Sequence, residues 1–265
     1  MYHQLYGLKK SPFNITADPH FFFESISHKE ALAALFYGLH EKKGIILITG
    51  EVGTGKTTLC KTFLDKLSDD IKTSVIFNPY FSEAQLLRAI AEDFGLEVKT
   101  RNRLGIIKQL NSFLIEINSS GGNAVLVIDE AQNLNSRQLE QVRLLSNLET
   151  FEGKLLQIIL SGQPELTSKL AKDNLRQIRQ RIFVKHNIRT LGPSEVKKYI
   201  NFRLKKAGLE EINITPSAHR LIYEFSKGTP RLVNMLCDRA MLLGFVKESE
   251  TYDEDIFRAC IEELK

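Results

Sequence analysis

The sequence predicts an α/β protein in which helices cover both faces of a parallel sheet, followed by a small all-helical lid domain. Three observations support this fold class. Up to about residue 190, short apolar runs of strand length alternate with segments whose apolar residues recur at helical spacing. After Thr190-Leu191-Gly192-Pro193, every further segment has the helical period. Several strands are apolar throughout, which is typical of a parallel sheet covered on both faces.

The apolar runs of strand length and the segments with helical period define the expected strands and helices in order. We expect strands at Ile45–Thr49, Ser74–Phe77, Ala124–Ile128, Leu155–Ser161 and Ile182–Ile188. Helices are expected around them at residues 28–41, 59–67, 83–94, 104–118, 136–148 and 165–170. Beyond the boundary near Leu191, helices are expected at residues 194–207, 216–226, 231–244 and 253–264, with no strand between them. The predicted organisation is an N-terminal arm (1–27), an α/β core (28–191) and a helical lid domain (192–265).

The composition is that of an ordinary globular protein. The chain has 265 residues, and its net charge of +4 is compatible with nucleic-acid binding without indicating it. Cys60, Cys237 and Cys260 lie far apart and form no CxxC pair, so we expect buried thiols in a reducing compartment, and no zinc site. The longest apolar runs are strand-sized and the N-terminus lacks the apolar region of a signal peptide. We therefore expect a cytoplasmic protein without a membrane span.

A glycine-rich stretch follows the first expected strand. Gly50-Glu51-Val52-Gly53-Thr54-Gly55-Lys56-Thr57 matches the phosphate-binding motif G-x-x-x-x-G-K-T, between a strand and a helix as the motif requires. Glycines let successive backbone N–H groups surround phosphate oxygens, and the helix N-terminus adds partial positive charge. We expect these eight residues and Thr58 to bind ATP. Lys56 would contact the β- and γ-phosphates, and the Thr57 hydroxyl would ligate Mg²⁺.

Two acidic residues end the apolar run at 124–128. Asp129 and Glu130 lie where a buried strand would deliver them to the edge of the sheet. We expect Asp129 to hold Mg²⁺ through water and Glu130 to act as the base that polarises the attacking water. A protein that only binds nucleotide would not need the second acid, so Glu130 favours hydrolysis.

Polar residues follow two other expected strands. Gln163, or alternatively Ser161, is a candidate for a side chain that senses the γ-phosphate, and a simple turn before Pro164 is an equally good interpretation. Asn78 ends the strand at 74–77 and is a weaker candidate for a residue that hydrogen-bonds Glu130 and holds it inactive.

Arginines occur in two further places. Arg176, Arg179 and Arg181 lie in LRQIRQRIF, and Arg181 is the candidate for a finger that a neighbouring subunit would supply; a solvated basic helix end is the alternative. Arg231 follows Gly228-Thr229-Pro230 at the start of a helix in the second domain. There it would fold over the γ-phosphate and couple the nucleotide to the angle between the domains.

Together these motifs resemble the AAA+ ATPases, and more closely the ATPase module of the ExeA/GspA family associated with bacterial secretion. The resemblance covers nearly the whole chain and is carried by YGLKKSPFNITADPHFFF, GEVGTGKTTL, VLVIDEAQNL, VRLLSNLETFEGKLLQIILSGQPEL, LRQIRQRI and GTPRLVNMLCDRA. It implies an ATP-hydrolysing P-loop fold with Gln163 at the first sensor, Arg181 at the finger and Arg231 at the second sensor. It also implies that Tyr6–Phe13 would pack beside the adenine. A ring, often hexameric, with ATP between its subunits is typical of the AAA+ class.

Two functions remain open at this point. The first is an oligomeric ATPase that drives or regulates assembly of a secretion or envelope complex. The second is an ATP-dependent DNA-binding switch of the type of the related TniB and MuB transposition ATPases, supported weakly by a basic stretch. That stretch comprises Lys197, Lys198, Arg203, Lys205 and Lys206, and a solvated helix face is its simpler interpretation.

An inactive nucleotide-gated scaffold is disfavoured, because Lys56, Asp129 and Glu130 are all present. Members of the secretion family commonly continue into a membrane span and a peptidoglycan-binding region, which this sequence does not contain. The resemblance therefore leaves open whether the chain is a fragment of a longer protein or a free-standing ATPase.

Overall fold

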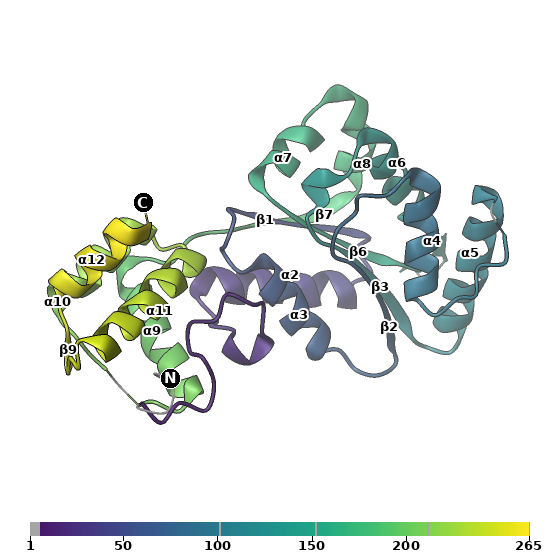
Figure 1. The fold of residues 1–265 in the computed structure, drawn as a ribbon. Coiled ribbons are helices and arrows are strands. Elements are labelled where there is room, and N and C mark those ends of the chain that lie inside the picture. Colours follow the sequence, from purple (N-terminus) through teal and green to yellow (C-terminus); the bar gives the residue numbers. More distant parts are fainter. Residues whose placement is uncertain (1–5, 101, 152, 211, 265) are drawn as a thin grey trace. The chain divides into compact units, whose positions relative to one another are not determined.

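The computed structural model describes residues 6–100, 102–151, 153–210 and 212–264. Its contacts divide the chain into two compact units (Figure 1). Among the described residues, the sheet unit comprises those within 29–51 and 59–188, and the helical unit comprises those within 6–28, 52–58 and 189–264. The glycine-rich loop at 52–58 thus belongs to the same unit as the N-terminal arm and the C-terminal helices.

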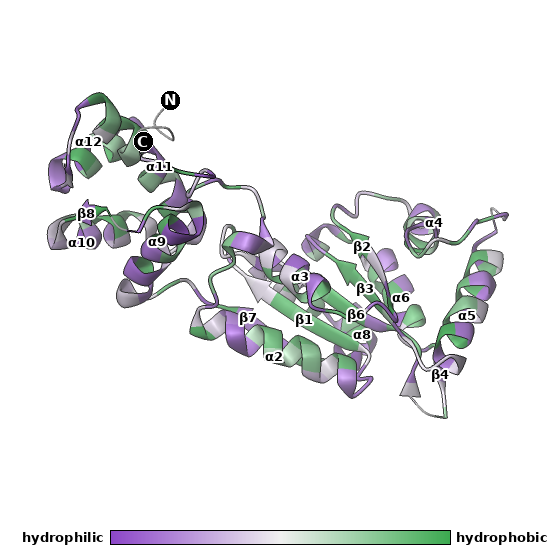
Figure 2. Ribbon diagram, turned by 90° about the horizontal axis from the view of Figure 1, so that it is seen from below, coloured by the Kyte–Doolittle hydropathy of each residue, from purple (hydrophilic) through white to green (hydrophobic). Residues whose placement is uncertain are grey.

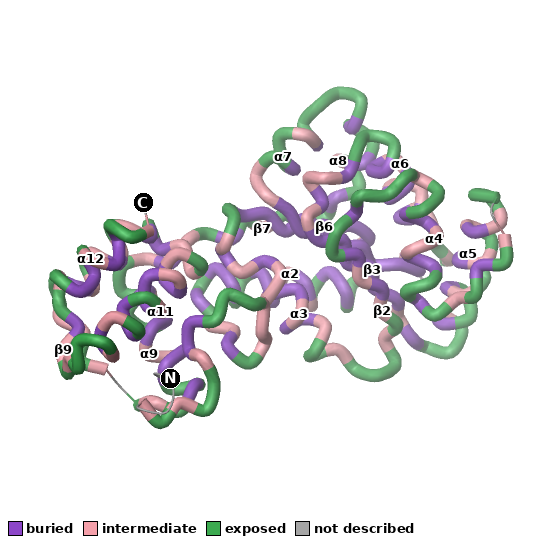
Figure 3. Tube along the Cα trace, viewed as in Figure 1, coloured by how far each residue is buried: buried purple, intermediate pink, exposed green. Residues whose placement is uncertain are grey.

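The sheet unit is built on a five-stranded parallel sheet, as predicted. The strands are β1 (Ile45–Gly50), β2 (Ile71–Ile76), β3 (Asn123–Ile128), β6 (Gln157–Gly162) and β7 (Ile182–Ile188), in the order β2-β3-β6-β1-β7. The central strands β1, β3 and β6 are almost wholly buried (Figure 3). Because β6 lies between β1 and β3, its carboxyl end lies between the strand that enters the glycine-rich loop and the strand that ends in the two acids.

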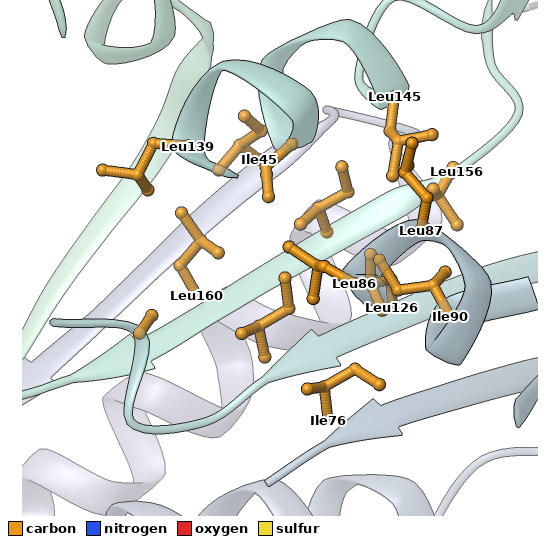
Figure 4. Packing of buried hydrophobic residues seen from close by; sticks show 14 of the residues in the cluster. Ile45, Ile76, Leu86, Leu87, Ile90, Leu126, Leu139, Leu145, Leu156 and Leu160 are labelled. Carbon is orange, nitrogen blue, oxygen red and sulfur yellow. The ribbon is translucent and has the colours of Figure 1, made fainter. Parts of the chain in front are cut away.

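Helices cover both faces of this sheet. One face carries α4 (Glu83–Asp93), α5 (Arg103–Ser119), α6 (Ser136–Leu145), α7 (Pro164–Leu170) and α8 (Arg176–Arg181), whose apolar residues form one cluster with alternate residues of the strands. Leu86, Leu87 and Ile90 of α4 and Leu139 and Leu145 of α6 lie over the strands in this cluster (Figure 4). Successive strand residues point to opposite faces, so a strand covered on both sides must be apolar at every position.

The other face of the sheet is covered by α2 (Ile26–His40) and α3 (Lys56–Asp65), which cross it in Figure 2. The rings of Phe36 and Phe63 lie 5.0 Å apart between these helices. Gly38 lies so close to Ile46 of β1 that a Cβ atom there would overlap the isoleucine side chain. A side chain at position 38 would therefore require the end of the Ile46 side chain to move.

Short elements complete the sheet unit. They are η2 (Ala131–Asn133), η3 (Asp173–Leu175) and the antiparallel pair β4 (Glu149–Thr150) and β5 (Gly153–Lys154). None of them has enough residues for a periodic apolar pattern, which explains why the sequence did not predict them.

The helical unit contains α9 (Pro193–Ala207), α10 (Pro216–Ser226), α11 (Pro230–Val246) and α12 (Glu254–Leu264), together with η1 (Pro19–Phe21). All four long helices match the predicted segments to within about two residues. The expectation that no strand intervenes was wrong, because β8 (Asn213–Ile214) pairs in parallel with β9 (Thr251–Tyr252). This two-residue pair joins the segment before α10 to the segment before α12.

The N-terminal arm packs on the helical unit. The Phe13 side chain is buried in the same apolar cluster as Leu204 of α9. The backbone N–H of Lys9 donates to the Ala207 carbonyl at 2.8 Å, and the hydroxyls of Tyr6 and Tyr252 are hydrogen-bonded at 2.7 Å. The arm is therefore an integral part of this unit's core.

Arg203 corrects one sequence-based expectation. It was expected on a solvated basic face, but it is buried, with 6% of its surface exposed. Its guanidinium donates to the carbonyls of Pro12 and Asn14 and to the Tyr199 hydroxyl, and it stacks 4.8 Å from the Phe21 ring centroid. Val196, Tyr199, Ile200, Leu204 and Ala207 form the buried apolar side of α9, and Arg203 is buried with them because it binds the arm rather than facing water.

Replacing Arg203 by Met should release the arm. Hydrogen bonds from a charged donor contribute about 1.5–3 kcal/mol. If the arm loses about 2 kcal/mol of binding free energy, the population of molecules with a detached arm would rise roughly 30-fold. Trypsin cleavage after Lys9 or Lys10 would then accelerate by a similar factor if opening is fast relative to cleavage. Lys198→Met on the exposed side of α9 is the control. Equal cleavage rates for Arg203→Met and the control would show that Arg203 does not hold the arm.

Two further expectations concern the interior and the membrane. Cys60, Cys237 and Cys260 are free and buried, as predicted, and burial raises the pKa of the Cys237 thiol. Within the described ranges, no helix combines the length and the apolar character that crossing a bilayer requires.

Candidate nucleotide site

The glycine-rich loop has the backbone conformation that its sequence predicts. Gly53 (φ +79°) and Gly55 (φ +95°) occupy the left-handed region, which favours glycine. Thr54 between them is fully buried, and α3 begins directly after the loop, at Lys56. A loop of this kind turns successive N–H groups inward at a helix N-terminus, where they bind anions.

His28 supports this loop, and sequence reasoning missed it. Its ring is buried, and Nε2 lies 3.0 Å from the Thr54 carbonyl oxygen. Nδ1 lies 2.7 Å from the Ser25 hydroxyl. If Ser25 donates to Nδ1, the ring carries its proton on Nε2 and donates to the loop. The only sequence signal was the spacing Ser25-x-x-His28 just before a helical pattern.

The first turn of α11 lies against the same loop. The backbone N–H of Arg231 donates to the Gly53 carbonyl at 3.2 Å. A Cβ atom on Gly53 would come within 2.6 Å of the Arg231 Cβ. The structure thus brings the predicted Arg231 and the P-loop together in one unit. The Arg231 side chain is exposed, which is compatible with contact to a phosphate, and that contact stays a prediction.

The two predicted acids lie together in the sheet unit, directly after β3. Asp129 is buried, and its Oδ1 accepts hydrogen bonds from the Ser161 hydroxyl at 2.6 Å and from the Glu130 backbone N–H at 3.0 Å. Ser161, the second candidate for the sensing residue, is therefore occupied in orienting Asp129. Asp129 and Gly50 both lie at the carboxyl edge of the sheet, where parallel α/β sheets bind ligands.

Glu130 is held by glutamines. It adopts a left-handed backbone conformation (φ 49°), and its Oε2 accepts hydrogen bonds from the Gln132 amide and, at 3.3 Å, from the Gln163 amide. Asn78, the sequence-based candidate for this partner, is exposed in the described structure. Gln163, the candidate for sensing the γ-phosphate, thus lies beside the proposed base, and its sensing role stays a prediction. Gln132 was not predicted as a site residue.

The three arginines of α8 differ in their surroundings. Arg179 donates to the Ala171 carbonyl at 2.7 Å, so it stabilises the turn after α7. Arg176 and Arg181 are exposed. An exposed position is required for a residue that would reach a second subunit, and the role of Arg181 stays a prediction.

The donor groups fit a magnesium nucleotide. The loop conformation at Gly53 and Gly55 suits phosphate oxygens, and a Cβ atom at either glycine would meet Arg231 or His28. Thr57 in the helical unit offers a hydroxyl oxygen, and Asp129 in the sheet unit offers carboxylate oxygens. Each taken by itself is a type of ligand that Mg²⁺ accepts.

Comparison with known proteins gives consistent matches. Residues 39–170 match the model of a family described as the AAA domain. The General secretion pathway protein A of Aeromonas hydrophila is 42% identical over 250 residues, which cover 94% of this chain and 46% of that protein. The chain therefore spans about half the length of this curated relative.

Solved structures share the fold at low sequence identity. Cdc6p from Pyrobaculum aerophilum matches with a TM-score of 0.70 and 16% identity, over 93% of this chain and 70% of that one. The Aeropyrum pernix ORC2 protein in ADPNP–ADP complexes matches with a TM-score of 0.66 and 17% identity, over 88% and 66%. The Thermotoga maritima RuvB branch migration motor has a TM-score of 0.61 and 21% identity, over 92% and 70%.

Proposed function

Because the chain belongs to the AAA+ ATPases of the GspA/ExeA family, we propose that it binds ATP at residues 50–58 and hydrolyses it. The observation that carries this proposal is the conformation of the loop, with left-handed Gly53 and Gly55 in front of Lys56. The relative with the same fold that holds ADPNP and ADP supports a nucleotide as the ligand.

In the proposed reaction, the loop N–H groups and Lys56 bind the phosphates, and the Thr57 hydroxyl and Asp129 hold the metal. Mg²⁺, when bound, supplies positive charge to the β- and γ-phosphate oxygens. Glu130 orients the attacking water and accepts its proton. Gln163 senses whether the γ-phosphate is present. Arg231 binds the phosphates from within the chain, and Arg181 of a neighbouring subunit stabilises charge in the transition state.

Lys56→Ala tests the nucleotide-binding step. Loss of a charge-assisted contact of about 1.5–3 kcal/mol predicts a tenfold to hundredfold rise in the Kd for ATP. Titration with a fluorescent ATP analogue measures it, with Lys108→Ala on the exposed side of α5 as the matched control. An unchanged Kd in Lys56→Ala would exclude the loop as the phosphate site.

We further propose that the ATPase cycle acts within a homo-oligomer, such as the hexameric ring typical of the AAA+ class, on protein partners of a secretion or envelope complex. The 42% identity to General secretion pathway protein A supports this choice. The arm at Tyr6–Phe13 would lie near the adenine, as the family resemblance implies.

A DNA-binding switch is the alternative function. Burial of Arg203 removes one of the five basic residues that favoured it, and leaves the exposed Lys197, Lys198, Lys205 and Lys206. Measured binding to duplex DNA in the presence of ATP, with steep salt dependence, would support this alternative.

A further inference from the structure

Gln132 connects the proposed base to the tip of the neighbouring strand. Its side-chain Nε2 donates to Glu130 Oε2, and its Oε1 accepts from the backbone N–H of Gln163 at 3.0 Å. The Gln132 amide therefore donates one hydrogen bond through Nε2 and accepts another through Oε1. Because Glu130 only accepts and a backbone N–H only donates, these two partners fix the orientation of the amide.

The residues around Gln132 leave little room for its side-chain amide to adopt another orientation. A Cβ atom on Gly162 would lie 2.8 Å from Gln132 Oε1, so the absence of a side chain there admits the amide. The backbone of Gln132 is held as well, because the Lys169 ammonium donates to the carbonyls of Gln132 and Leu134. Burial lowers the pKa of Lys169, consistent with an ammonium group partly withdrawn from water.

We infer that Gln132 is a positioning residue for hydrolysis, which couples the direction of the Glu130 carboxylate to the position of the β6 tip at Gln163. A movement of the β6 tip changes the hydrogen bond at Gln132 Oε1. The same rigid amide transmits the change to Glu130 through Nε2. Gln163 also contacts Glu130 directly, through its side-chain amide at 3.3 Å. The inference rests on the proposed ATPase function of this site.

Two variants separate this role from simple loss of structure. Gln132→Ala removes both bonds and should lower kcat tenfold to hundredfold, with little change in the KM for ATP, because Glu130 loses its fixed direction. Gln132→Glu keeps a similar size, but the ionised carboxyl repels Glu130.

The test measures kcat and KM for the wild type, both variants, Glu130→Gln and the exposed control Gln177→Ala. We expect both Gln132 variants to lower kcat while the KM for ATP stays close to the wild-type value, and the control to match the wild type. A wild-type kcat in Gln132→Ala, or a loss of kcat matched by an equal rise in KM, would overturn the coupling role while the ATPase function stands. A wild-type protein without turnover would instead overturn the proposed function, and the role of Gln132 with it.

Discussion

Glu130→Gln is expected to lower kcat for ATP hydrolysis by about 10²- to 10⁴-fold, while the Kd for ATP stays within a factor of about three of the wild-type value. The substitution keeps the size of the side chain and removes its capacity to accept a proton from water. It also places an amide opposite those of Gln132 and Gln163, both of which donate to Oε2 of Glu130 in the wild type. Phosphate release and titration with a fluorescent ATP analogue measure the two quantities separately.

Glu116→Gln is the matched control for this prediction. Glu116 lies on α5 in the same unit, is exposed, and undergoes the same chemical change. Its kcat should equal that of the wild type. Retention of more than a tenth of the wild-type kcat in Glu130→Gln would assign the base to another residue.

Gly228→Ala is expected to cause the largest loss of stability. Gly228 has φ +75°, and its carbonyl accepts a hydrogen bond from the Leu191 N–H at 2.9 Å. A Cβ atom there would overlap the Leu191 carbonyl oxygen, which belongs to the backbone and has no alternative rotamer. The left-handed conformation costs about 1–2 kcal/mol for alanine, and relief of the overlap adds about 1–3 kcal/mol. A total of about 3 kcal/mol corresponds to a fall of roughly 10 °C in Tm.

Gly208→Ala separates the two causes. Gly208 lies in the same unit with φ +99°, but a Cβ atom there would meet the Lys9 side chain and the Gly7 carbonyl oxygen at ordinary contact distances of 3.4 to 3.8 Å. It should therefore show the conformational cost alone, about 1–2 kcal/mol. Equal Tm values for the two variants by calorimetry would mean that the Leu191–Gly228 contact relaxes without cost.

The sequence predicted the elements whose residues repeat with a clear period. The five sheet strands and the long helices bury whole faces, and burial on one or both faces leaves a pattern over six or more residues. β2 was predicted to begin three residues too late, because Ile71, Lys72 and Thr73 are partly or fully exposed and do not form a continuous apolar run.

The sequence could not predict contacts between distant residues. Arg203 has the spacing of a solvated face, but Pro12 and Asn14 of the arm provide carbonyl acceptors that bury it. Gln132 and His28 likewise acquire their roles from neighbours brought by the fold, the tip of β6 for Gln132 and the glycine-rich loop for His28. In contrast, the P-loop and the acids after β3 were predictable, because each is a short motif at the end of a recognisable strand.

The most direct test of the central claim is phosphate release from magnesium ATP by the purified chain, measured over a range of protein concentrations with and without duplex DNA. The account predicts turnover without DNA and a rate per subunit that rises with concentration in the wild type and stays low in Arg181→Ala. No phosphate release at any concentration would contradict it.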